Sequence, residues 1–595
     1  MVFGKHINRY YLKYSWMLLL GLLALVVVDV AQLKVPELYR MVVNGLNLGT
    51  SEADGVTYPF DMDFLLDKVC RPLCFVIIMI VAGRFLWRVG FFGAAVRMEK
   101  DLRLRMFDHA KDLSQQYYQV NKVGDLMSLF TNDLDTIQDC FGNGILTAAD
   151  AVLMGSMAFI KMFRMNKLLT GFSVIPMAFL LVCATLVGKK MSKKWKERQE
   201  AFSKLSDFSQ ESFSGIAVIK AFAKEAKELM AFRELNKHNE KVNVEFVRMS
   251  TLMNIMVTLF VESVMCVILG YGGYLVHEGT FNAGELIEFI GYFSSIVWPI
   301  MAVSMLIDMC ARASASVKRV GELLDAPVDV KDDEKSIVNE TPEIKGTIEF
   351  KHLNFTFPGS SLEVLHDLSF SIEAGENVGL IGKTGAGKTA IVDLISRIYN
   401  VPDGTVFVDG MDVNTIPIRE LRKHIAYVPQ DNFLFSESIG KNIAFAFEDD
   451  NDKAAIEEAA VLSDVHDNIC EFPEKYDTVL GERGVTVSGG QKQRISIARA
   501  LMKQAEILIL DDSVSAVDTK TERTILDNLK RTRAGKTTIL IAHRITTIEH
   551  MDKIIFIDDG RLVDVGNHKE LSERCPAYAE MVAMQRLEDE RKERA

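Results

Sequence analysis

Residues 382–389, GKTGAGKT, decide the fold of the C-terminal half of the chain. They match the pattern G-x-x-x-x-G-K-[S/T] and lie between an apolar segment, 377–381, and a helical run, 390–398, which is the strand, loop and helix setting that this motif requires. Glycines let backbone N–H groups surround phosphate oxygens, and a helix N-terminus adds a favourable dipole. The sequence therefore predicts a nucleoside triphosphate site, with Lys388 as a positive charge and the Thr389 hydroxyl directed at Mg²⁺.

A second strand is predicted where four apolar residues, 507–510, lead into Asp511 and Asp512. A continuous apolar run of this length is typical of a parallel strand that is buried on both faces. Mg²⁺ prefers oxygen ligands and keeps several waters, so a carboxylate at the C-terminal end of such a strand suits it. Asp511 is accordingly predicted to be a Mg²⁺ ligand at the end of a buried strand.

Further motifs occur in the order found in ATP-binding cassette (ABC) proteins. VSGGQ at residues 487–491 resembles the LSGGQ signature of that family, with Val487 in place of leucine. The other matches are Phe357 before Pro358 as the aromatic that stacks on adenine, Gln430 in YVPQ as the Q-loop, GERG at 481–484 as the X-loop, SAVD at 515–518 as the D-loop, and His543 in IAHR as the switch histidine. The C-terminal half therefore resembles an ABC nucleotide-binding domain.

This resemblance implies which residues form the ATP site. Two nucleotide domains of such proteins enclose two ATP molecules, each held by the Walker motifs of one domain and the signature of the other. The residues implied to contact ATP at this chain's own Walker motifs are Phe357, Gly382, Thr384, Gly385, Ala386, Gly387, Lys388, Thr389, Ala390 and Gln430. Those implied to hold Mg²⁺ are Thr389, Gln430 and Asp511, and those implied in catalysis are Asp512, His543 and Gln430. The signature residues implied to contact the partner's ATP are Val487, Ser488, Gly489, Gly490 and Gln491.

Asp512 departs from the family pattern, in which the residue after the Walker B aspartate is usually glutamate. In ABC proteins the residue at this position orients and polarises the attacking water as a general base. Aspartate is shorter by one C–C bond, ~1.5 Å, and a misplacement of about 1 Å can cost on the order of a hundredfold in rate. Ala390 also replaces a usual hydroxyl, at a cost of about 1 kcal/mol. We therefore expect a site that binds MgATP but hydrolyses it poorly; a base that is merely somewhat slower is the alternative.

The signature, by contrast, keeps Ser488, Gly489 and Gly490, which can donate hydrogen bonds to a γ-phosphate on a partner. A weak base beside an intact signature resembles the degenerate-site subunit of heterodimeric bacterial multidrug ABC exporters. The expected partner is therefore a different half-transporter, with Glu after its Walker B aspartate. A homodimer is the alternative.

The N-terminal half is expected to span a membrane. Hydrophobic residues make up 49% of the 595-residue chain, which is high beside a charged fraction of 25%, and the excess is concentrated in this half. About 20 residues at 1.5 Å rise cross a hydrocarbon core. Buried helices of a large soluble domain are the alternative. The six apolar runs of suitable length are 16–30, 73–96, 145–163, 168–187, 252–276 and 286–307.

The predicted fold is an α-helical domain with six transmembrane spans, followed by an α/β P-loop domain of ABC type with an antiparallel β flank and a helical subdomain. The predicted boundaries are 1–325 for the membrane domain, 326–344 for the linker and 345–595 for the nucleotide domain. Prolines and acidic residues interrupt the apolar periodicity across the linker. The run 580–595 is charge-rich, and we expect it to be a solvated tail rather than a docking element.

Charge predicts the orientation of the membrane domain. Lys5, Arg9 and Lys13 precede the first span, whereas the next loop is acidic, so the positive-inside rule places the N-terminus and the nucleotide domain in the cytoplasm. Arg164 and Lys167 fall in a short external turn and are exceptions to the rule. We expect a bacterial cytoplasmic membrane, with an organelle membrane as the alternative. The net charge of −12, without a basic patch in the nucleotide domain, argues against nucleic acid as a partner.

Polar segments 117–137 and 212–225 resemble the intracellular loops of ABC exporters, whose coupling helices dock on nucleotide domains. The expected function is ATP-driven export of a small amphipathic or drug-like substrate across a membrane by a dimer of half-transporters. A peptide or lipid exporter of the same architecture is one alternative, and an ATP-gated channel or regulatory subunit is another.

The sequence gives little information about substrate contacts. Glu262 lies near the middle of the fifth predicted span, and an ionisable residue inside a membrane is by default a candidate functional residue. The alternative for Glu262 is a hydrogen bond between helices. Asp29 and Asp308 lie nearer the ends of their spans and are expected to reach water or a neighbouring helix.

Overall fold

The computed structural model describes residues 4–594, apart from 54, 333–335, 337–342, 448–451, 482–483, 485–486 and 516. The side chains of 177–189, 192, 304 and 588–594 are also outside the described part. Parts of the predicted linker, X-loop and D-loop therefore lie outside the described residues. The chain forms two compact units, one of Met1–Lys111 with Val123–Ala326 and one of Asp112–Lys122 with Pro327–Ala595.

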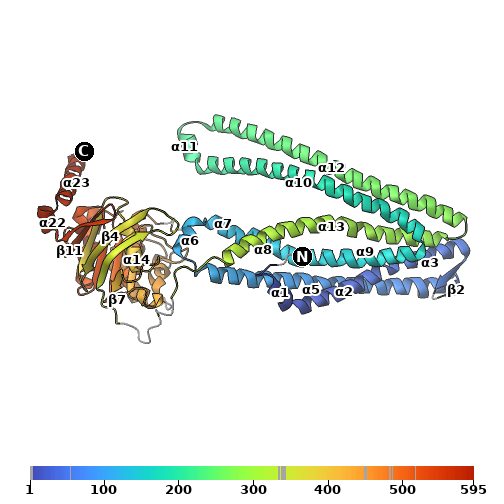
Figure 1. Cartoon of the computed structure of the whole chain (residues 1–595), viewed down its shortest axis with the longest axis horizontal. Helices are drawn as coiled ribbons and strands as arrows, with labels where there is room; N and C mark the ends of the chain where they lie inside the picture. The colour runs from blue at the N-terminus through green and yellow to red at the C-terminus, as the bar shows by residue number, and fades with distance from the viewer. Residues whose placement is uncertain are drawn as a thin grey trace. The chain divides into compact units, whose positions relative to one another are not determined.

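The N-terminal unit consists mainly of long helices (Figure 1). In hydrocarbon every backbone N–H and C=O must pair within its own segment, which a continuous helix achieves. Its α-helices are α1 Asn8–Lys13, α2 Ser15–Gln32, α3 Lys34–Leu48, α4 Met62–Phe64, α5 Arg71–Ala110, α7 Val123–Ser128, α8 Leu134–Asp139, α9 Ile145–Met165, α10 Lys167–Ser214, α11 Ile216–Ala221, α12 Glu225–His277 and α13 Ala283–Leu324. A short hairpin of β1 Thr50–Ala53 and β2 Val56–Pro59 follows α3, and π-helical segments occupy Leu65–Cys70, Leu129–Asp133 and Cys140–Gly144.

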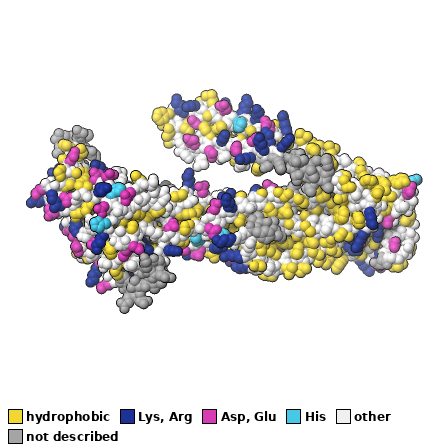
Figure 2. Space-filling model, in the orientation of Figure 1, with side chains coloured by type: hydrophobic (Ala, Val, Ile, Leu, Met, Phe, Trp, Pro, Cys, Tyr) yellow, Lys and Arg dark blue, Asp and Glu magenta, His cyan; other side chains and the backbone are white. Residues whose placement is uncertain are grey.

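Among the described residues, five segments are long and apolar enough to cross a membrane. They are Ser15–Leu48, Met62–Ala110, Val123–Met165, Glu225–His277 and Ala283–Leu324. The remaining predicted span, 168–187, begins α10 but extends into residues whose side chains are outside the described part. The count of six is therefore not confirmed. Figure 2 shows hydrophobic side chains gathered on the long helices of this unit, with charged ones near α11.

Helices α10 and α12 run side by side as a long hairpin that carries α11 at its tip (Figure 1). At the other end the hairpin packs on α9 and α13, where Ile268 and Phe293 share one apolar core. Toward α11 the hairpin separates from the other helices of its unit (Figure 1). Four large apolar side chains around the tip are exposed in this chain: Phe213 at 75%, Ile216 at 42%, Val218 at 61% and Phe222 at 70%.

The C-terminal unit is built on two sheets. The larger has the strand order β12-β11-β5-β10-β9-β8, with β12 antiparallel to a block of five parallel strands. The smaller is an antiparallel flank in the order β4-β3-β6-β7. The strands are β3 Ile348–Thr356, β4 Glu363–Ile372, β5 Asn377–Gly382, β6 Val406–Val408, β7 Met411–Asp412, β8 Ile425–Val428, β9 Ile507–Asp511, β10 Thr537–Ile541, β11 Lys553–Asp558 and β12 Arg561–Gly566.

Helices cover both faces of the larger sheet, which is why its central strands are continuous apolar runs. All residues of β9 and β10 are buried. A separate apolar core joins α16, α17, α18 and α19 into a helical subdomain, as expected. The α-helices of this unit are α6 Gln115–Val120, α14 Lys388–Ile395, α15 Ile418–Lys423, α16 Ile439–Ile443, α17 Lys453–Leu462, α18 His466–Cys470, α19 Gly489–Met502, α20 Thr519–Thr532, α21 Ile545–Ile548, α22 His568–Arg574 and α23 Pro576–Arg594, with 3₁₀ turns at Ala444–Ala446 and Lys475–Asp477.

The first half of α23 docks on the nucleotide domain. Tyr578 and Val582 are buried, and Met581 packs against the same core. The prediction that 580–595 is a solvated tail is therefore wrong for its first residues, because the charge-rich composition of the end of this run concealed the apolar positions at its start.

Candidate nucleotide-binding site

Topology brings the predicted ATP-site residues to one edge of the larger sheet. Strand β10 lies between β5 and β9 and is parallel to both. Strand β5 leads into the glycine-rich loop, β9 ends at Asp511, and β10 is followed closely by His543. In open α/β sheets, ligands bind in the crevice outside the carboxyl ends of the strands. The three predicted parts of the site therefore start from neighbouring strands at that edge.

The conformation of the loop explains its glycines. Gly385 has φ +85° and Gly387 has φ +90°, a left-handed region that side chains with a Cβ rarely adopt. Gly387 is also the N-cap of α14. At Gly382 an added Cβ would lie 2.0 Å from the carbonyl oxygen of Ile557 on the adjacent strand. The loop thus turns sharply into a helix N-terminus, the geometry that surrounds a phosphate with backbone N–H groups.

Lys388 is buried in this loop. Its Nζ donates to the carbonyl oxygens of Gly382 and Lys383, both at 2.9 Å. Burial lowers the pKa of Lys388, while Asp511 and Asp512 act in the opposite direction. An ammonium has three N–H donors, so the two carbonyls fix its position and leave a third donor for an anionic ligand.

Thr389 and Asp511 meet across the site. The Thr389 hydroxyl donates to Asp511 Oδ2 at 2.9 Å. Burial raises the pKa of Asp511, the Thr389 hydrogen bond opposes that rise, and the Asp512 carboxylate adds to it. A hydroxyl and a carboxylate oxygen side by side fit Mg²⁺, which takes few protein ligands and keeps waters and phosphate oxygens. Gln430, the other predicted ligand, lies beyond β8 and is exposed.

The backbone at Asp512 is firmly held. Its φ is +48°, a left-handed conformation in which Asp is enriched among residues other than glycine. Its amide donates to the Ile541 carbonyl at 3.0 Å, and its own carbonyl accepts from Ser515 Oγ at 2.9 Å. Because the backbone is tied to β10, the reach of the carboxylate depends mainly on the length of the side chain.

The loop that carries His543 is held by a residue that sequence reasoning missed. Gln585 of α23 donates from Nε2 to the His543 carbonyl at 2.7 Å, and its Oε1 accepts from the Ile545 amide at 2.7 Å. The imidazole itself is exposed. No motif marks Gln585, and the one available signal was the apolar spacing of Tyr578 and Val582 before it.

The predicted adenine-stacking residue connects to α6. The Phe357 ring lies 5.2 Å from that of Tyr399 in an edge-to-face arrangement. Tyr399 is 2% exposed, and the side chain of Gln119 on α6 lies close to its hydroxyl. Burial raises the pKa of Tyr399, which remains a neutral phenol. A segment from the polar stretch 117–137 thus contacts the nucleotide domain beside Phe357.

The signature residues are placed differently from the Walker residues. Ser488 is the N-cap of α19 in a capping box, in which Gln491 N donates to Ser488 Oγ at 3.3 Å and Ser488 N donates to Gln491 Oε1 at 2.9 Å. Ser488 and Gly489 are exposed, and an added Cβ at Gly489 would meet nothing within 4 Å. Val487 belongs to the core of the helical subdomain. The start of α19 therefore faces open space in a single chain.

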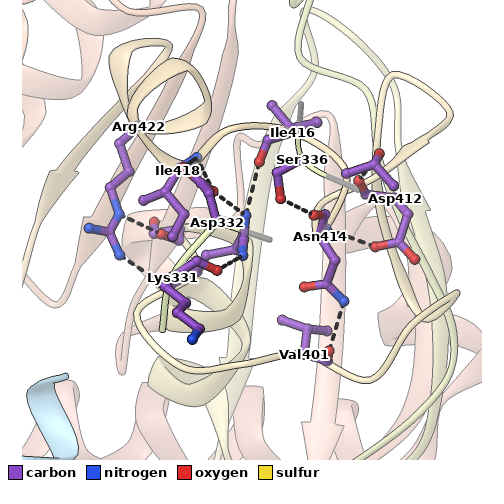
Figure 3. A network of polar contacts seen from close by, with 12 residues as sticks. Lys331, Asp332, Ser336, Val401, Asp412, Asn414, Ile416, Ile418 and Arg422 are labelled. Atoms are coloured by element: carbon purple, nitrogen blue, oxygen red, sulfur yellow. Dashed lines mark hydrogen bonds and ion pairs between the residues drawn. The ribbon is translucent and has the colours of Figure 1, made fainter. Parts of the chain in front are cut away.

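Asp332 of the linker lies in a network of polar contacts that also includes Ile418 of the nucleotide domain (Figure 3). Arg397 lies just beyond α14 and is 3% exposed. Its guanidinium donates to Asp332 Oδ1 at 3.3 Å and to the Ile416 carbonyl at 2.9 Å. Asp332 also accepts from the Ile418 amide at 2.9 Å. The linker is thus bonded to the nucleotide domain just beyond the end of α14.

Two acidic residues of the predicted membrane spans, Glu262 and Asp29, differ in their exposure. Glu262 on α12 is exposed in this chain. Asp29 on α2 is 1% exposed, and its carboxyl lies within hydrogen-bonding reach of that of Asp150 on α9. Asp150 Oδ2 accepts from Trp298 Nε1 at 3.2 Å. The expectation that Asp29 reaches a neighbouring helix is thus met, although sequence reasoning did not identify Asp150 as its neighbour.

A glycine-rich loop between β5 and α14, an acidic strand end beside it, an antiparallel flank and a helical subdomain that begins a helix with VSGGQ together define an ABC-type nucleotide-binding domain. It follows a domain of long apolar helices in the same chain.

Comparison with known proteins agrees with this class. The family model described as the ABC transporter transmembrane region matches residues 18–300, and that described as ABC transporter matches 365–515. The chain is 36% identical over 98% of its length, and 97% of the relative's, to the probable multidrug resistance ABC transporter ATP-binding/permease protein YheI of Bacillus subtilis (strain 168). It is 33% identical, over 97% of its length and 96% of the relative's, to the multidrug resistance-like ATP-binding protein MdlA of Escherichia coli (strain K12).

A solved structure agrees as well. The structure of a bacterial Atm1-family ABC exporter with ATP bound matches with a TM-score of 0.77 and 25% identity, over 97% of this chain and 98% of that one. The chain therefore belongs to the ABC transporters, as a half-transporter in which a membrane domain is fused to an ABC nucleotide-binding domain.

Proposed function

We propose that this chain is one half of a dimeric exporter that uses ATP to move small amphipathic or drug-like compounds out across a membrane, and that its own Walker site hydrolyses ATP slowly. The observation that carries this proposal is the contrast within one domain between assembled Walker residues that end in a short carboxylate and an open signature. The names of the relatives, which refer to multidrug resistance, support the substrate class.

The geometry supports the following roles for the residues of the Walker site. Thr389, Asp511 and Gln430 would hold Mg²⁺, which neutralises phosphate charge when bound. Lys388 and the backbone amides of 382–390 bind the phosphates. Phe357, packed against Tyr399, stacks on the adenine ring of ATP. Asp512 and His543 orient the attacking water. Hydrolysis here is slow because the Asp512 backbone is fixed to β10 and its carboxylate stops short by one methylene.

The dimer is supported by two surfaces of this chain. The signature at Ser488 and Gly489 faces open space, and the hairpin tip near Phe213 and Phe222 exposes apolar side chains. A partner's Walker site covers the first surface, and a partner's nucleotide domain covers the second.

The proposed orientation has six spans with the N-terminus and the nucleotide domain in the cytoplasm. The bacterial relatives support a bacterial cytoplasmic membrane.

The partner is a different half-transporter with Glu after its Walker B aspartate, and most hydrolysis occurs where this chain's signature meets the partner's Walker motifs. The test is Asp512→Glu in the assembled transporter, with ATP turnover measured at each site. We expect turnover at this chain's Walker site to rise on the order of tenfold to a hundredfold as the carboxylate regains its reach. Unchanged turnover, or strong ATPase activity from this chain purified alone, would contradict the heterodimer.

Three acidic residues, Glu262 and the pair Asp29 and Asp150, are proposed as substrate contacts. Glu262 is exposed on the hairpin, and Asp29 and Asp150 face each other between α2 and α9. Two ionised carboxylates in contact repel each other, so a proton or a cationic group between them is favourable. Uptake of a cationic amphiphile into inverted vesicles should fall for Glu262→Gln or Asp29→Asn. Uptake that is unchanged in both variants would remove these residues from the substrate path.

A further inference from the structure

A small cavity of about 180 Å³ opens in the N-terminal unit between the end of α2, the start of α3 and the end of α9. Its lining has an apolar part and a charged part. The apolar residues are Val30, Leu33, Met157 and Ile160, and the charged residues are Lys34, Glu37, Lys161 and Arg164. The two kinds of side chain follow one another along the same helices, so the cavity is amphipathic.

The charged part has an excess of positive charge. Glu37 Oε2 accepts from Lys34 Nζ at 2.7 Å, and Glu37 Oε1 accepts from Lys161 Nζ and from the Tyr292 hydroxyl. Both carboxylate oxygens are thus already engaged. Arg164 is exposed and has no carboxylate partner among the described residues. Three basic side chains against one carboxylate leave a net charge of +2 on the lining.

The apolar part opens to the surface of the helices. Val30 is 48% exposed and Ile160 is 49% exposed, whereas Leu33 between them is buried and forms the floor. Val30 and Ile160 lie in segments that are apolar enough to span a membrane. Lys34 begins α3 about one turn after Val30, and Lys161 and Arg164 lie in the last turns of α9. In a bilayer the acyl chains lie in the hydrocarbon core and the headgroups lie just outside it. The apolar part of the cavity therefore suits an acyl chain, and the basic part suits a headgroup.

The basic residues also need an explanation. Under the proposed orientation this end of the helices is external, where the positive-inside rule disfavours Lys and Arg. Arg164 contributes to none of the contacts described above for the ATP site or the hairpin. An anionic ligand would compensate for the excess charge.

We propose that this cavity binds one anionic phospholipid. Its phosphodiester contacts Arg164, Lys34 and Lys161, and an acyl chain lies against Val30 and Ile160. Guanidinium groups bind phosphate oxygens in a bidentate manner, and basic pockets between membrane helices recognise anionic headgroups. The inference requires that the helices lie in a membrane but is independent of ATP hydrolysis and of the transported substrate.

The test uses the assembled full-length transporter, incorporated into nanodiscs of phosphatidylcholine and phosphatidylglycerol in equal amounts and released for native mass spectrometry. Arg164→Gln should reduce the retained phosphatidylglycerol about fivefold relative to phosphatidylcholine, as expected for ~1 kcal/mol per basic residue. Lys167→Gln is the matched control, because Lys167 lies near Arg164 but does not line the cavity. Val30→Trp, which fills the apolar part, should reduce retention of the lipid without changing the charge.

Three results would overturn the proposal. The first is equal retention of the two lipids by the unaltered transporter, as expected if a partner's helices cover the cavity. A second is an equal loss in Arg164→Gln and Lys167→Gln, which would show a general surface effect. The third is displacement of the lipid by excess glycerol phosphate, which would show an anion site without a role for the acyl chains. Loss of ATPase activity in any variant does not bear on these outcomes.

Discussion

The two halves of the predicted ATP machinery are built differently within one domain. The Walker half is closed, because Lys388 is buried and bonded to two carbonyls and the Thr389 hydroxyl reaches Asp511. The signature half is open, because Ser488 and Gly489 are exposed at the start of α19. A single chain therefore assembles its Walker residues but leaves its signature uncovered, as the proposed dimer requires.

The largest effect on ATP turnover is expected for Gly489→Asp in the assembled transporter. The added side chain has room at Gly489, and an acidic residue suits a helix N-terminus, so folding should be preserved. The carboxylate would repel the partner's γ-phosphate, and ATP turnover should fall about a hundredfold, as for loss of an anion-stabilising donor. ATP labelling at this chain's Walker motifs is the control and should remain. Loss of that labelling instead would show that the signature serves its own chain.

The next largest effect is expected for Lys388→Ala. Removal of a charge-assisted donor should weaken MgATP binding at this chain's Walker site about tenfold to a hundredfold. Lys383→Ala is the matched control, because Lys383 is a neighbouring exposed lysine paired with Asp558. Binding can be measured by titration with a fluorescent ATP analogue. Equal losses in the two variants would mean that charge in the loop, and not the buried position, determines affinity.

A smaller effect is expected for Gln585→Ala, measured in the Asp512→Glu background where hydrolysis at this site is visible. Loss of two hydrogen bonds would release the loop of His543 and lower that hydrolysis about tenfold. Glu580→Ala, on an exposed face of the same helix, should change nothing. If both variants lose activity equally, α23 acts through overall stability and not through the loop.

The smallest effect is expected for Tyr399→Phe, which removes the buried hydroxyl that lies close to Gln119 on α6. ATP binding should be retained, while substrate transported per ATP hydrolysed should fall about twofold to fivefold, since one neutral polar contact contributes ~1 kcal/mol. Tyr578→Phe is the control, because it removes a buried tyrosine hydroxyl elsewhere in the domain, one that bonds His568. A loss of ATP affinity would place Tyr399 in base recognition instead.

The parts of the site that the sequence predicts are those fixed by local pattern. The loop before Lys388 has to bend where its glycines stand, and the apolar run before Asp511 has to be buried, so their meeting at one sheet edge follows from parallel topology. Contacts between distant segments leave no such pattern. Gln585 reaches His543 from another helix, and Asp29 meets Asp150 through the packing of α2 on α9. Packing complementarity between helices is not written in the composition of either one.

The exposed tip of the α10–α12 hairpin has a consequence for how the cell must produce this protein. Phe213, Val218 and Phe222 are exposed in the single chain, and such apolar surface is what chaperones and quality-control proteases recognise. Under the proposed heterodimer, a chain made in excess over its partner should therefore be degraded. Accumulation of the transporter would then be limited by the scarcer subunit, which favours synthesis of the two chains in matched amounts.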